Sequence, residues 1–384
     1  MSERLLRLVC TAAIAAGAVL APVPATAEPQ PSEPGAPGKP GAHGERSITE
    51  LLTGLQRLYR AAEKATETYN ATEEKLKKQR AQVAKLNGQL ARTRLSLQDS
   101  RAAAGRLARQ QYQGSSEIST YVRLLLARDP QHALDQGQVI GQLAQQRAET
   151  VDRLVSDEKK AAGLARRARK ALDDQLTLAD RHKKNRDAVH KRLKEVEELL
   201  ASLRADQIAA VAALERAKEA EQQKKFMASG TLKGARTPSR AGEAALRYAV
   251  GQIGKPYVWG AVGPDSFDCS GLTSRAWSQA GKLIPRTSQE QWARLRRVPL
   301  SSLRPGDLVI YFPEATHVAL YLGNGMVVQA PRPGANVKVS PIAANPVLGA
   351  VRPDPAGEPQ RRYTPPRLPR GSMNGSDAGY TGQG

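Results

Sequence analysis

Hydrophobic residues recur with a period of seven along a stretch of the chain that begins near residue 47. The segment Ser47-Ile48-Thr49-Glu50 can form a capping box, in which the serine and glutamate side chains satisfy free N–H groups, and it predicts a helix start. A sustained period of seven is typical of coiled coils. The positions that share this period are Leu55, Ala62, Tyr69, Leu76, Val83, Leu90, Leu97 and Ala104.

A second stretch with the same period follows Pro130, which breaks the first helix because proline has no backbone N–H to donate. The apolar segment 121–126, just before it, is expected to form a hairpin tip or a docking surface. Two long helices joined by a break favour an antiparallel pair within one chain, and a dimer with one long helix per chain is the alternative. We predict a coiled-coil region over residues 47–226, whose second apolar set is Ile140, Ala144, Val151, Leu154, Ala161, Ala165, Ala168, Leu172, Ala179, Val189, Leu193, Val196, Leu200 and Leu203.

The pattern changes after residue 226. Residues 227–238 predict a flexible linker, and Ser239 then precedes a short helix whose apolar stripe is Leu246, Ala249, Val250 and Ile253. All tryptophans and most phenylalanines also lie after residue 239, so we expect a compact core over residues 239–353. Residues 354–384 are rich in Pro, Arg and Gly and are predicted to be a disordered basic tail.

The N-terminus has the three parts of a secretory signal peptide over residues 1–27. Arg4 and Arg7 supply its charge, a short apolar run follows, and Ala25-Thr26-Ala27 is a small-residue cleavage site. The run is too short to span a bilayer as a helix. The next segment, 28–46, is a disordered Pro/Gly-rich linker. We therefore predict a protein that is secreted or held at the cell wall by non-covalent contacts.

The formal net charge of +21 implies an acidic partner. Nucleic acid is the usual partner of so basic a chain, but export argues against it. Anionic wall polymers or lipid head groups are the better candidates outside the cell. No His, Cys and Asp residues cluster at the spacing of metal ligands, so the sequence predicts neither a metal site nor a cofactor.

Cys269 is the only cysteine that remains after the predicted signal peptide, with its Cys10, is removed. A lone cysteine in an exported protein is either an inert buried residue or a reactive thiol. A helix is predicted to begin at Cys269, because Cys269, Leu272, Thr273, Ala276 and Ala280 share one face. The free N–H groups and positive potential of a helix start favour the thiolate, so this placement indicates a nucleophile.

A cysteine nucleophile needs a base, and His317 is the only histidine of the compact domain. His317 begins an alternating strand, and a second strand ends near Gln329 after the loop Gly323-Asn324-Gly325. A three-residue loop would put His317 and Gln329 on the same face, whereas a two-residue loop would put them on opposite faces. In the first case Gln329 could orient the imidazole, which gives a Cys-His-Gln constellation.

Several motifs in residues 245–352 resemble the NlpC/P60 family of cysteine peptidases. They occur in the family's order, and they are Pro256-Tyr257-Val258-Trp259-Gly260, Phe267-Asp268-Cys269-Ser270-Gly271-Leu272, Arg286-Thr287-Ser288-Gln289, Arg304-Pro305-Gly306-Asp307-Leu308-Val309 and the segment that begins at His317. The resemblance implies an α+β papain-like domain, here preceded by a long α-helical antiparallel coiled coil. It also implies hydrolysis of stem peptides in peptidoglycan, typically between D-glutamate and the diamino acid.

The resemblance assigns roles by position. Cys269 matches the nucleophile, His317 the general base and Gln329 the third catalytic residue, which is most often histidine in the family. Tyr257 matches a tyrosine that approaches the cysteine and assists the oxyanion site. Three further residues match the substrate groove, and they are Asp268, Ser270 and Ser288. Another departure is Gly260-Ala261, where the family carries two glycines.

The helical region is similar to that of division-associated wall hydrolases. That similarity implies that the helices hold the peptidase inactive until an ABC-transporter-like membrane complex pulls them away. We expect the helical pair to cover the Cys269 groove, in the same chain or across a dimer. Two other functions stay open from the sequence: a non-enzymatic coiled-coil scaffold with a degenerate peptidase domain, and a papain-like amidase.

Overall fold

The computed structural model describes residues 47–114, 122, 130–232, 234 and 236–373. The chain divides into two units, and the described residues all lie in the second, which begins at Arg46. The predicted signal peptide, the linker 28–46 and all of segment 121–126 except Val122 lie outside the described residues. Within the described ranges, the helices are too polar or too short for any of them to cross a bilayer.

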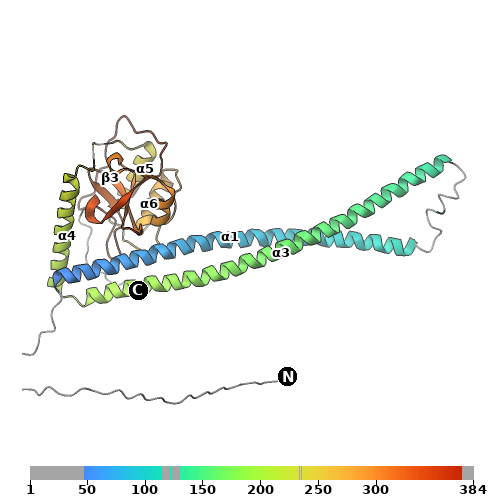
Figure 1. Ribbon diagram of the computed structural model, residues 1–384, viewed down its shortest axis with the longest axis horizontal. Helices are drawn as coiled ribbons and strands as arrows, with labels where there is room; N and C mark the ends of the chain where they lie inside the picture. Colours follow the sequence, from blue (N-terminus) through green and yellow to red (C-terminus); the bar gives the residue numbers. More distant parts are fainter. Residues whose placement is uncertain (1–46, 115–121, 123–129, 233, 235, 374–384) are drawn as a thin grey trace, which may run out of the picture. The chain divides into compact units, whose positions relative to one another are not determined.

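Two long helices, α1 (Ile48–Gly114) and α3 (Pro130–Ala201), run side by side in opposite directions (Figure 1). α1 begins with the predicted capping box, since the Ser47 N–H donates to Glu50 Oε2 at 2.9 Å and the Glu50 N–H to Ser47 Oγ at 3.2 Å. α3 begins at Pro130, and a proline is tolerated at a helix start because its missing N–H would have no helical partner there. α1 ends at Gly114, before the break that was predicted at Pro130. Both helices of the pair belong to one chain, which is the first of the two arrangements considered from the sequence.

The seam between α1 and α3 is mostly apolar, and its α1 side follows the predicted period. On α3 the prediction is partly wrong, because Leu164 and Ala171 are buried in the central cluster while the predicted Leu172 and Val151 are exposed. Leu51 and Leu55 pack near Val196, and further along α1 Val83 packs with residues much earlier in α3, which gives the antiparallel direction. The central cluster consists of Val83, Leu86, Leu90, Leu164, Ala168 and Ala171. Burial of these side chains is the main source of stability for such a pair, because isolated helices are marginal in water.

A separate helix, α4 (Ala205–Ala228), follows a break at residues 202–204 and leaves the α1–α3 pair. The coiled-coil region predicted over residues 47–226 includes this segment. Instead, Phe226 packs against the core of the C-terminal domain, and Gln223 donates to Gly325 O at 2.9 Å and accepts from the Ala343 N–H at 3.2 Å. The few apolar residues of α4 are thus used against the domain and the start of α1 rather than along one continuous seam.

The C-terminal domain is an α+β fold around a six-stranded antiparallel sheet with the order β1-β6-β2-β3-β4-β5. Its strands are β1 (Arg296–Val298), β2 (Leu308–Tyr311), β3 (His317–Gly323), β4 (Met326–Gln329), β5 (Lys338–Pro341) and β6 (Val347–Arg352). The helices are α5 (Arg240–Val250), α6 (Cys269–Gln279) and α7 (Ser288–Arg294), with short 3-10 turns at Leu300–Ser302 and Ile342–Ala344.

The sheet is buried on both faces because its strands alternate between two cores. Residues such as Ile310, Val318 and Leu320 pack under α5 and α6. The intervening residues Val309 and Ala319 face the other core, against which Phe226 of α4 packs. The fold class predicted from the sequence is confirmed: an antiparallel α+β domain follows a long pair of helices.

The β3–β4 hairpin reaches the expected register by an unexpected route. Gly323 pairs with Met326, so the loop is the two-residue turn Asn324-Gly325, with φ of 53° and 71°. Leu322 is an extra residue in a bulge, beyond which Leu320 pairs with Val328. A two-residue loop was predicted to separate His317 from Gln329, but the bulge restores the register that puts them on one face.

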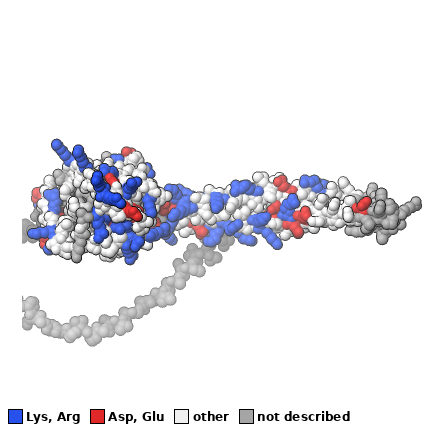
Figure 2. Space-filling model, turned by 90° about the horizontal axis from the view of Figure 1, so that it is seen from above, with Lys and Arg blue, Asp and Glu red and all other residues white. Residues whose placement is uncertain are grey.

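Residues 354–373 differ from the predicted disorder. The Asp354 carboxylate binds Arg304 at 2.7 Å, the Gln360 N–H donates to Pro238 O at 2.9 Å, and Tyr363 packs on the domain core. Composition alone pointed to a disordered tail, but these few anchors attach it to the domain. On the face shown in Figure 2, Lys and Arg are widely spread over the C-terminal domain and along the helical pair.

Candidate active site

Cys269 is the first residue of α6, as the sequence predicts. The helix starts there because Asp268 caps it, with Oδ1 accepting from the Gly271 N–H at 2.6 Å. A side chain at Gly271 would meet Ala261 O at 2.1 Å, so the close approach of this turn to the preceding loop requires glycine. The cap and the tight turn fix the thiol at the helix start, where free N–H groups also gather.

Asp268 is the centre of a buried polar network. Arg286 donates to both of its oxygens, at 3.0 and 2.6 Å, and also donates to Ser270 Oγ at 2.8 Å. The Gly260 N–H donates to Asp268 Oδ2 at 2.9 Å. A fork of two bonds from an arginine holds a carboxylate in a defined orientation. Asp268 therefore joins the Tyr257–Gly260 loop to the cysteine helix.

His317 and Gln329 lie side by side, because the bulge at Leu322 puts them on the same face of the β3–β4 hairpin. His317 Nε2 is 2.7 Å from Gln329 Oε1, and both residues are buried. With Oε1 as the acceptor, Nε2 carries the proton and Nδ1 is left as the basic nitrogen. This is the tautomer that a general base needs if Nδ1 faces a thiol.

The other predicted site residues surround the cysteine helix. Tyr257 is buried, and its hydroxyl has no hydrogen-bond partner among the described residues. Ser288 is fully buried at the start of α7, which Thr287 caps. Ser270 follows the cysteine and contacts Arg286. All of these residues come from loops and helix starts that one edge of the domain brings together.

The groove next to Cys269 is filled by α1. The Cys269 thiol donates to Glu67 Oε1 at 3.5 Å, Ser270 Oγ donates to the same oxygen at 2.6 Å, and the Ser288 N–H donates to Oε2 at 3.2 Å. Glu67 is 1% exposed, so the side chain is enclosed by the domain.

Two more residues on the same face of α1 extend this contact. Glu63 Oε1 lies 3.5 Å from His317 Nδ1, and Asn70 donates to Asp268 Oδ2 at 3.0 Å. Glu63, Glu67 and Asn70 are spaced by four and three residues, which places them on one helical face. Trp259 of the domain packs edge-on against Tyr69 at 4.8 Å, beside the α1–α3 seam.

In this arrangement the thiol and the imidazole each face a glutamate of α1. Among the described residues no hydrogen bond joins Cys269 to His317. Burial, with the nearby charges of Glu67 and Asp268, raises the pKa of the Cys269 thiol well above its ordinary value. Burial also lowers the pKa of His317 to about 4, although the bond to Gln329 opposes this. The pair is therefore held as a neutral thiol and a neutral imidazole.

The pKa values of the two glutamates, Glu63 and Glu67, are also shifted by their surroundings. Burial, followed by the charge of Glu67, raises the pKa of Glu63 to about 8. Burial and the charge of Asp268 also raise the pKa of Glu67, although Ser270 and Arg286 act in the opposite direction. Both carboxyls are therefore neutral more often than carboxyls in water, which lowers the cost of burying them.

The sequence analysis missed four residues of this site. Arg286 was part of a quoted motif, but its contact with Asp268 was not anticipated. Glu63, Glu67 and Asn70 carry no distinguishing signal, because α1 is polar along most of its surface and their spacing is that of any helical face. In the described ranges, no three His, Cys, Asp or Glu side chains are grouped as metal ligands would be.

The NlpC/P60 family matches residues 254–349, which include the cysteine, the histidine and the glutamine described above. Residues 254–349 belong to the NlpC/P60 family. A probable endopeptidase of Corynebacterium glutamicum is 47% identical over 111 residues, which are 29% of this chain and 53% of the relative. The peptidoglycan endopeptidase RipA of Mycolicibacterium smegmatis is 40% identical over 114 residues, which are 26% of this chain and 23% of the relative.

Among solved structures, the NlpC/P60 domain is similar to RipD of Mycobacterium tuberculosis, described as a non-catalytic NlpC/p60 protein adapted to peptidoglycan binding. The identity is 32%, the match covers 30% of this chain and 98% of RipD, and the TM-score is 0.28. The chain spans about half the length of the Corynebacterium relative and about a quarter of RipA. The helical pair lies outside the matched family region.

Proposed function

We propose that the protein is a peptidoglycan endopeptidase that cleaves stem peptides between D-glutamate and the diamino acid. The observation that carries the proposal is the position of Cys269 in the first turn of α6, within an NlpC/P60 domain that also holds the His317–Gln329 pair. Relatives of this domain are named endopeptidases, which supports the same reaction class.

In the proposed reaction, His317 Nδ1 takes the thiol proton and the thiolate attacks the scissile carbonyl carbon. The tetrahedral intermediate collapses to a thioester and expels the amine, which takes the proton from His317. Water, deprotonated by His317, then hydrolyses the thioester and restores the thiol. Gln329 Oε1 holds the Nε2 proton throughout, so Nδ1 stays the reactive nitrogen.

The groove residues take the remaining roles. Tyr257 and the N–H groups at the start of α6 are proposed to stabilise the oxyanion. Asp268, Ser270 and Ser288 are proposed to contact the stem peptide, because their polar atoms border the space that Glu67 fills. A peptide can enter this space only after α1 has left it.

We also propose that α1 is a reversible cover of the groove. The support is the direct contact of Glu67 with Cys269 and Ser270, together with the contact between Glu63 and His317. Release would come from a partner that pulls the helical pair, such as an ABC-transporter-like complex of the division machinery. Export to the cell wall, and attraction of the basic surface to anionic wall polymers rather than nucleic acid, belong to the same proposal.

The reaction is tested by incubating the protein with purified cell wall and identifying the released fragments by mass spectrometry. Released peptides that begin with the diamino acid, present with the natural protein and absent with Cys269→Ala, support the proposal, because the D-glutamate end of the cleaved stem stays attached to the glycan. Whole stem peptides freed from sugar would instead indicate an amidase. Binding to the wall without release, even after the groove is opened by Glu67→Arg, would indicate a scaffold.

The role of Gln329 is tested in the Glu67→Arg background. Gln329→Ala is expected to lower the rate of fragment release by roughly tenfold to a thousandfold, because the imidazole loses its orientation. Gln329→His is the matched control, since an imidazole at this position can also hold the Nε2 proton. Equal rates for Gln329→Ala and its parent would remove Gln329 from the mechanism.

A further inference from the structure

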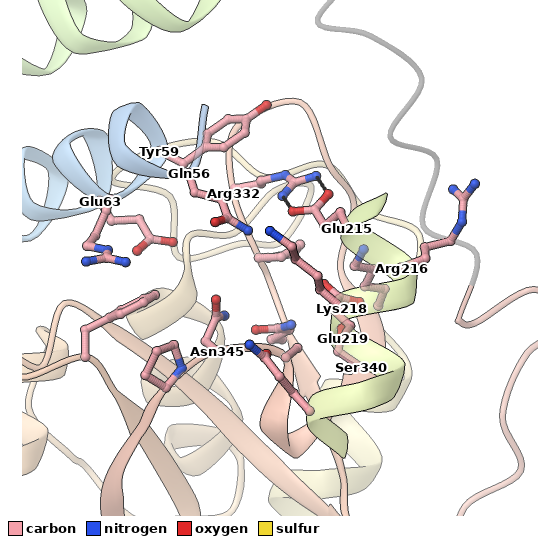
Figure 3. A pocket seen from close by; sticks show the side chains of 18 of the residues that line it. Gln56, Tyr59, Glu63, Glu215, Arg216, Lys218, Glu219, Arg332, Ser340 and Asn345 are labelled. Carbon is pink, nitrogen blue, oxygen red and sulfur yellow. Dashed lines mark hydrogen bonds and ion pairs between the residues drawn. The ribbon is translucent and has the colours of Figure 1, made fainter. Parts of the chain in front are cut away.

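A cavity of about 690 Å³ lies beside the covered groove, between α1, α4 and the β4–β5 part of the sheet. Its volume is in the usual range of small-molecule sites. Glu63 comes from α1, Lys218 from α4 and Ser340 from β5, so three separate elements form its wall (Figure 3). Lys338 of β5 also lines the cavity. Gln329 also lines the cavity, which is therefore adjacent to the catalytic residues.

The carboxyls that line the cavity are largely neutralised. Arg332 donates to both oxygens of Glu215, at 2.6 and 2.9 Å. Burial alone would raise the pKa of Glu215, but the bonds and charge of Arg332 outweigh it and lower the pKa. Glu63 is mostly protonated at neutral pH, because its pKa is raised to about 8 by burial and by the charge of Glu67.

The cations that line the cavity outnumber the acids that line it. The cations are Arg60, Arg216, Lys218, Arg332 and Lys338, and the acids are Glu63, Glu215 and Glu219. Arg60 lies over the Phe312 ring at 4.8 Å, and Arg216 extends away from the cavity (Figure 3). The cavity therefore carries an excess of positive charge inside a concave wall, where potentials are focused. In addition, Glu63 Oε2 is buried in this wall without a hydrogen-bond partner in the structure.

We propose that this cavity binds a phosphate-bearing anion, and that the bound anion holds α1 and α4 on the NlpC/P60 domain. Phosphate fits because its several oxygens can accept from donors that come from three directions, and because lysine binds it as a point charge. Because the wall exists only while α1, α4 and β5 are together, a ligand of this cavity stabilises the covered form. The consequence for activity rests on the proposed role of α1 as a cover.

The anion could be free phosphate or the phosphate of a wall polymer, which present the same oxygens. Pyrophosphate and a short glycerol-phosphate oligomer are the two probes that distinguish these sources, and trehalose is a neutral probe of similar size. Preference for the oligomer would assign the cavity to a wall polymer, and preference for pyrophosphate would assign it to a free phosphate. Either preference supports a phosphate site, whereas equal effects of trehalose would overturn it.

The test uses the full chain and measures the rate at which iodoacetamide alkylates Cys269, read by peptide mass spectrometry at constant ionic strength and pH 7. We expect a saturating phosphate probe to slow alkylation several-fold. The Lys218→Ala/Lys338→Ala double variant should lose this slowing, whereas Lys224→Ala should keep it, because Lys224 is an exposed cation of α4 outside the cavity. No slowing, faster alkylation, or slowing that persists in the double variant would overturn the proposal.

The Glu67→Arg variant separates this proposal from the function on which it rests. If Glu67→Arg is alkylated no faster than the natural protein, α1 does not protect the thiol and the cover itself is wrong. If Glu67→Arg is alkylated faster but phosphate probes leave the natural protein unchanged, only the anion site is wrong.

Discussion

Helix α1 forms two interfaces whose chemistry is opposite. Against α3 it presents Leu86, Leu90 and similar side chains, which are buried among other apolar residues. Against the NlpC/P60 domain it presents Glu63, Glu67 and Asn70, which are just as deeply buried but polar. The first contact is mostly apolar, although Ser96 and Ser100 of α1 also donate to Asp157 of α3. The second depends on hydrogen bonds and on the charge of two carboxyls.

If α1 is the cover proposed above, this difference favours opening of the contact between α1 and the NlpC/P60 domain over opening of the α1–α3 seam. A fully buried leucine contributes about 1.5–3 kcal/mol whatever the pH. A buried carboxyl is costly to desolvate and adds stability only while it is neutral or well paired. In the proposal that α1 is a reversible cover, the helical pair leaves the groove as one body, with its seam intact, when the polar contacts are lost.

The largest effect is expected from a variant that disrupts only the polar interface between α1 and the NlpC/P60 domain. Glu67→Arg would place a second guanidinium beside Arg286 and remove the acceptor of the Cys269, Ser270 and Ser288 donors. A buried charge without a partner costs about 3 kcal/mol or more, and the introduced guanidinium would be one, so alkylation of Cys269 should rise on the order of a hundredfold. Unchanged circular dichroism of the helices would show that the seam remains.

A variant in the α1–α3 seam is expected to have the opposite pattern, with lower stability of the helical pair and unchanged alkylation of Cys269. Leu86→Ala should lower the free energy of unfolding of the helical pair by about 2 kcal/mol, because it leaves a space in the central cluster. Chemical denaturation followed by circular dichroism measures this. Alkylation of Cys269 should stay unchanged in native buffer, since Leu86 is several helical turns from Glu67. A matching rise in alkylation would mean that the two interfaces are not independent.

A single hydrogen bond tests the polar interface more gently. Asn70→Ala removes the donor that reaches Asp268 Oδ2 at 3.0 Å. A bond to a charged group contributes about 1.5–3 kcal/mol, so alkylation of Cys269 should rise roughly tenfold or more. Asn87→Ala, on the same helix beyond the groove, is the matched control and should have no effect.

The smallest expected effect is the pH dependence. The pKa of Glu63 is raised from 4.5 to about 8, so its contribution to the covered form is complete below 4.5 and is lost as the pH rises toward 8. Glu63 is faced by Glu67 and Arg60 of α1, by Arg332 and by His317. The pKa of His317 is lowered from 6.5 to about 4, so its contribution is complete above 6.5 and is lost as the pH falls toward 4.

The cover should therefore loosen from pH 6.5 upward, and alkylation should rise by a few-fold more than deprotonation of the thiol explains. Glu63→Gln cannot titrate at this position and should show a shallower rise over the same range. An identical pH profile for the natural protein and Glu63→Gln would exclude Glu63 as the titrating group.

Much of the fold follows from local signals in the sequence. The capping box at Ser47 and the start of α6 at Cys269 each depend on neighbouring residues, and each occurs as predicted. The heptads also predicted the seam, because a period of seven needs a partner on one face. The Asn324-Gly325 turn was considered, but not with the Leu322 bulge, because a bulge depends on the pairing of both strands.

The covered groove depends on information that no local signal carries. Glu63 and Glu67 look like solvated residues of a polar helix, and only the docking of the domain makes them buried. α4 leaves the coiled-coil run at residues 202–204 without a proline or glycine, because its partner is the distant β3–β4 turn. Cys269 and His317 were predictable as candidates, while the glutamates that contact them were not.

The central claim is that α1 restrains an otherwise competent thiol. The most direct measurement compares the initial rates at which the natural chain, Glu67→Arg and Glu67→Arg/Cys269→Ala release fragments from purified cell wall. We predict a slow rate for the natural chain, a much faster rate for Glu67→Arg and no release for the double variant. Equal rates for the natural chain and Glu67→Arg, with the Cys269-dependent activity present in both, would contradict the claim.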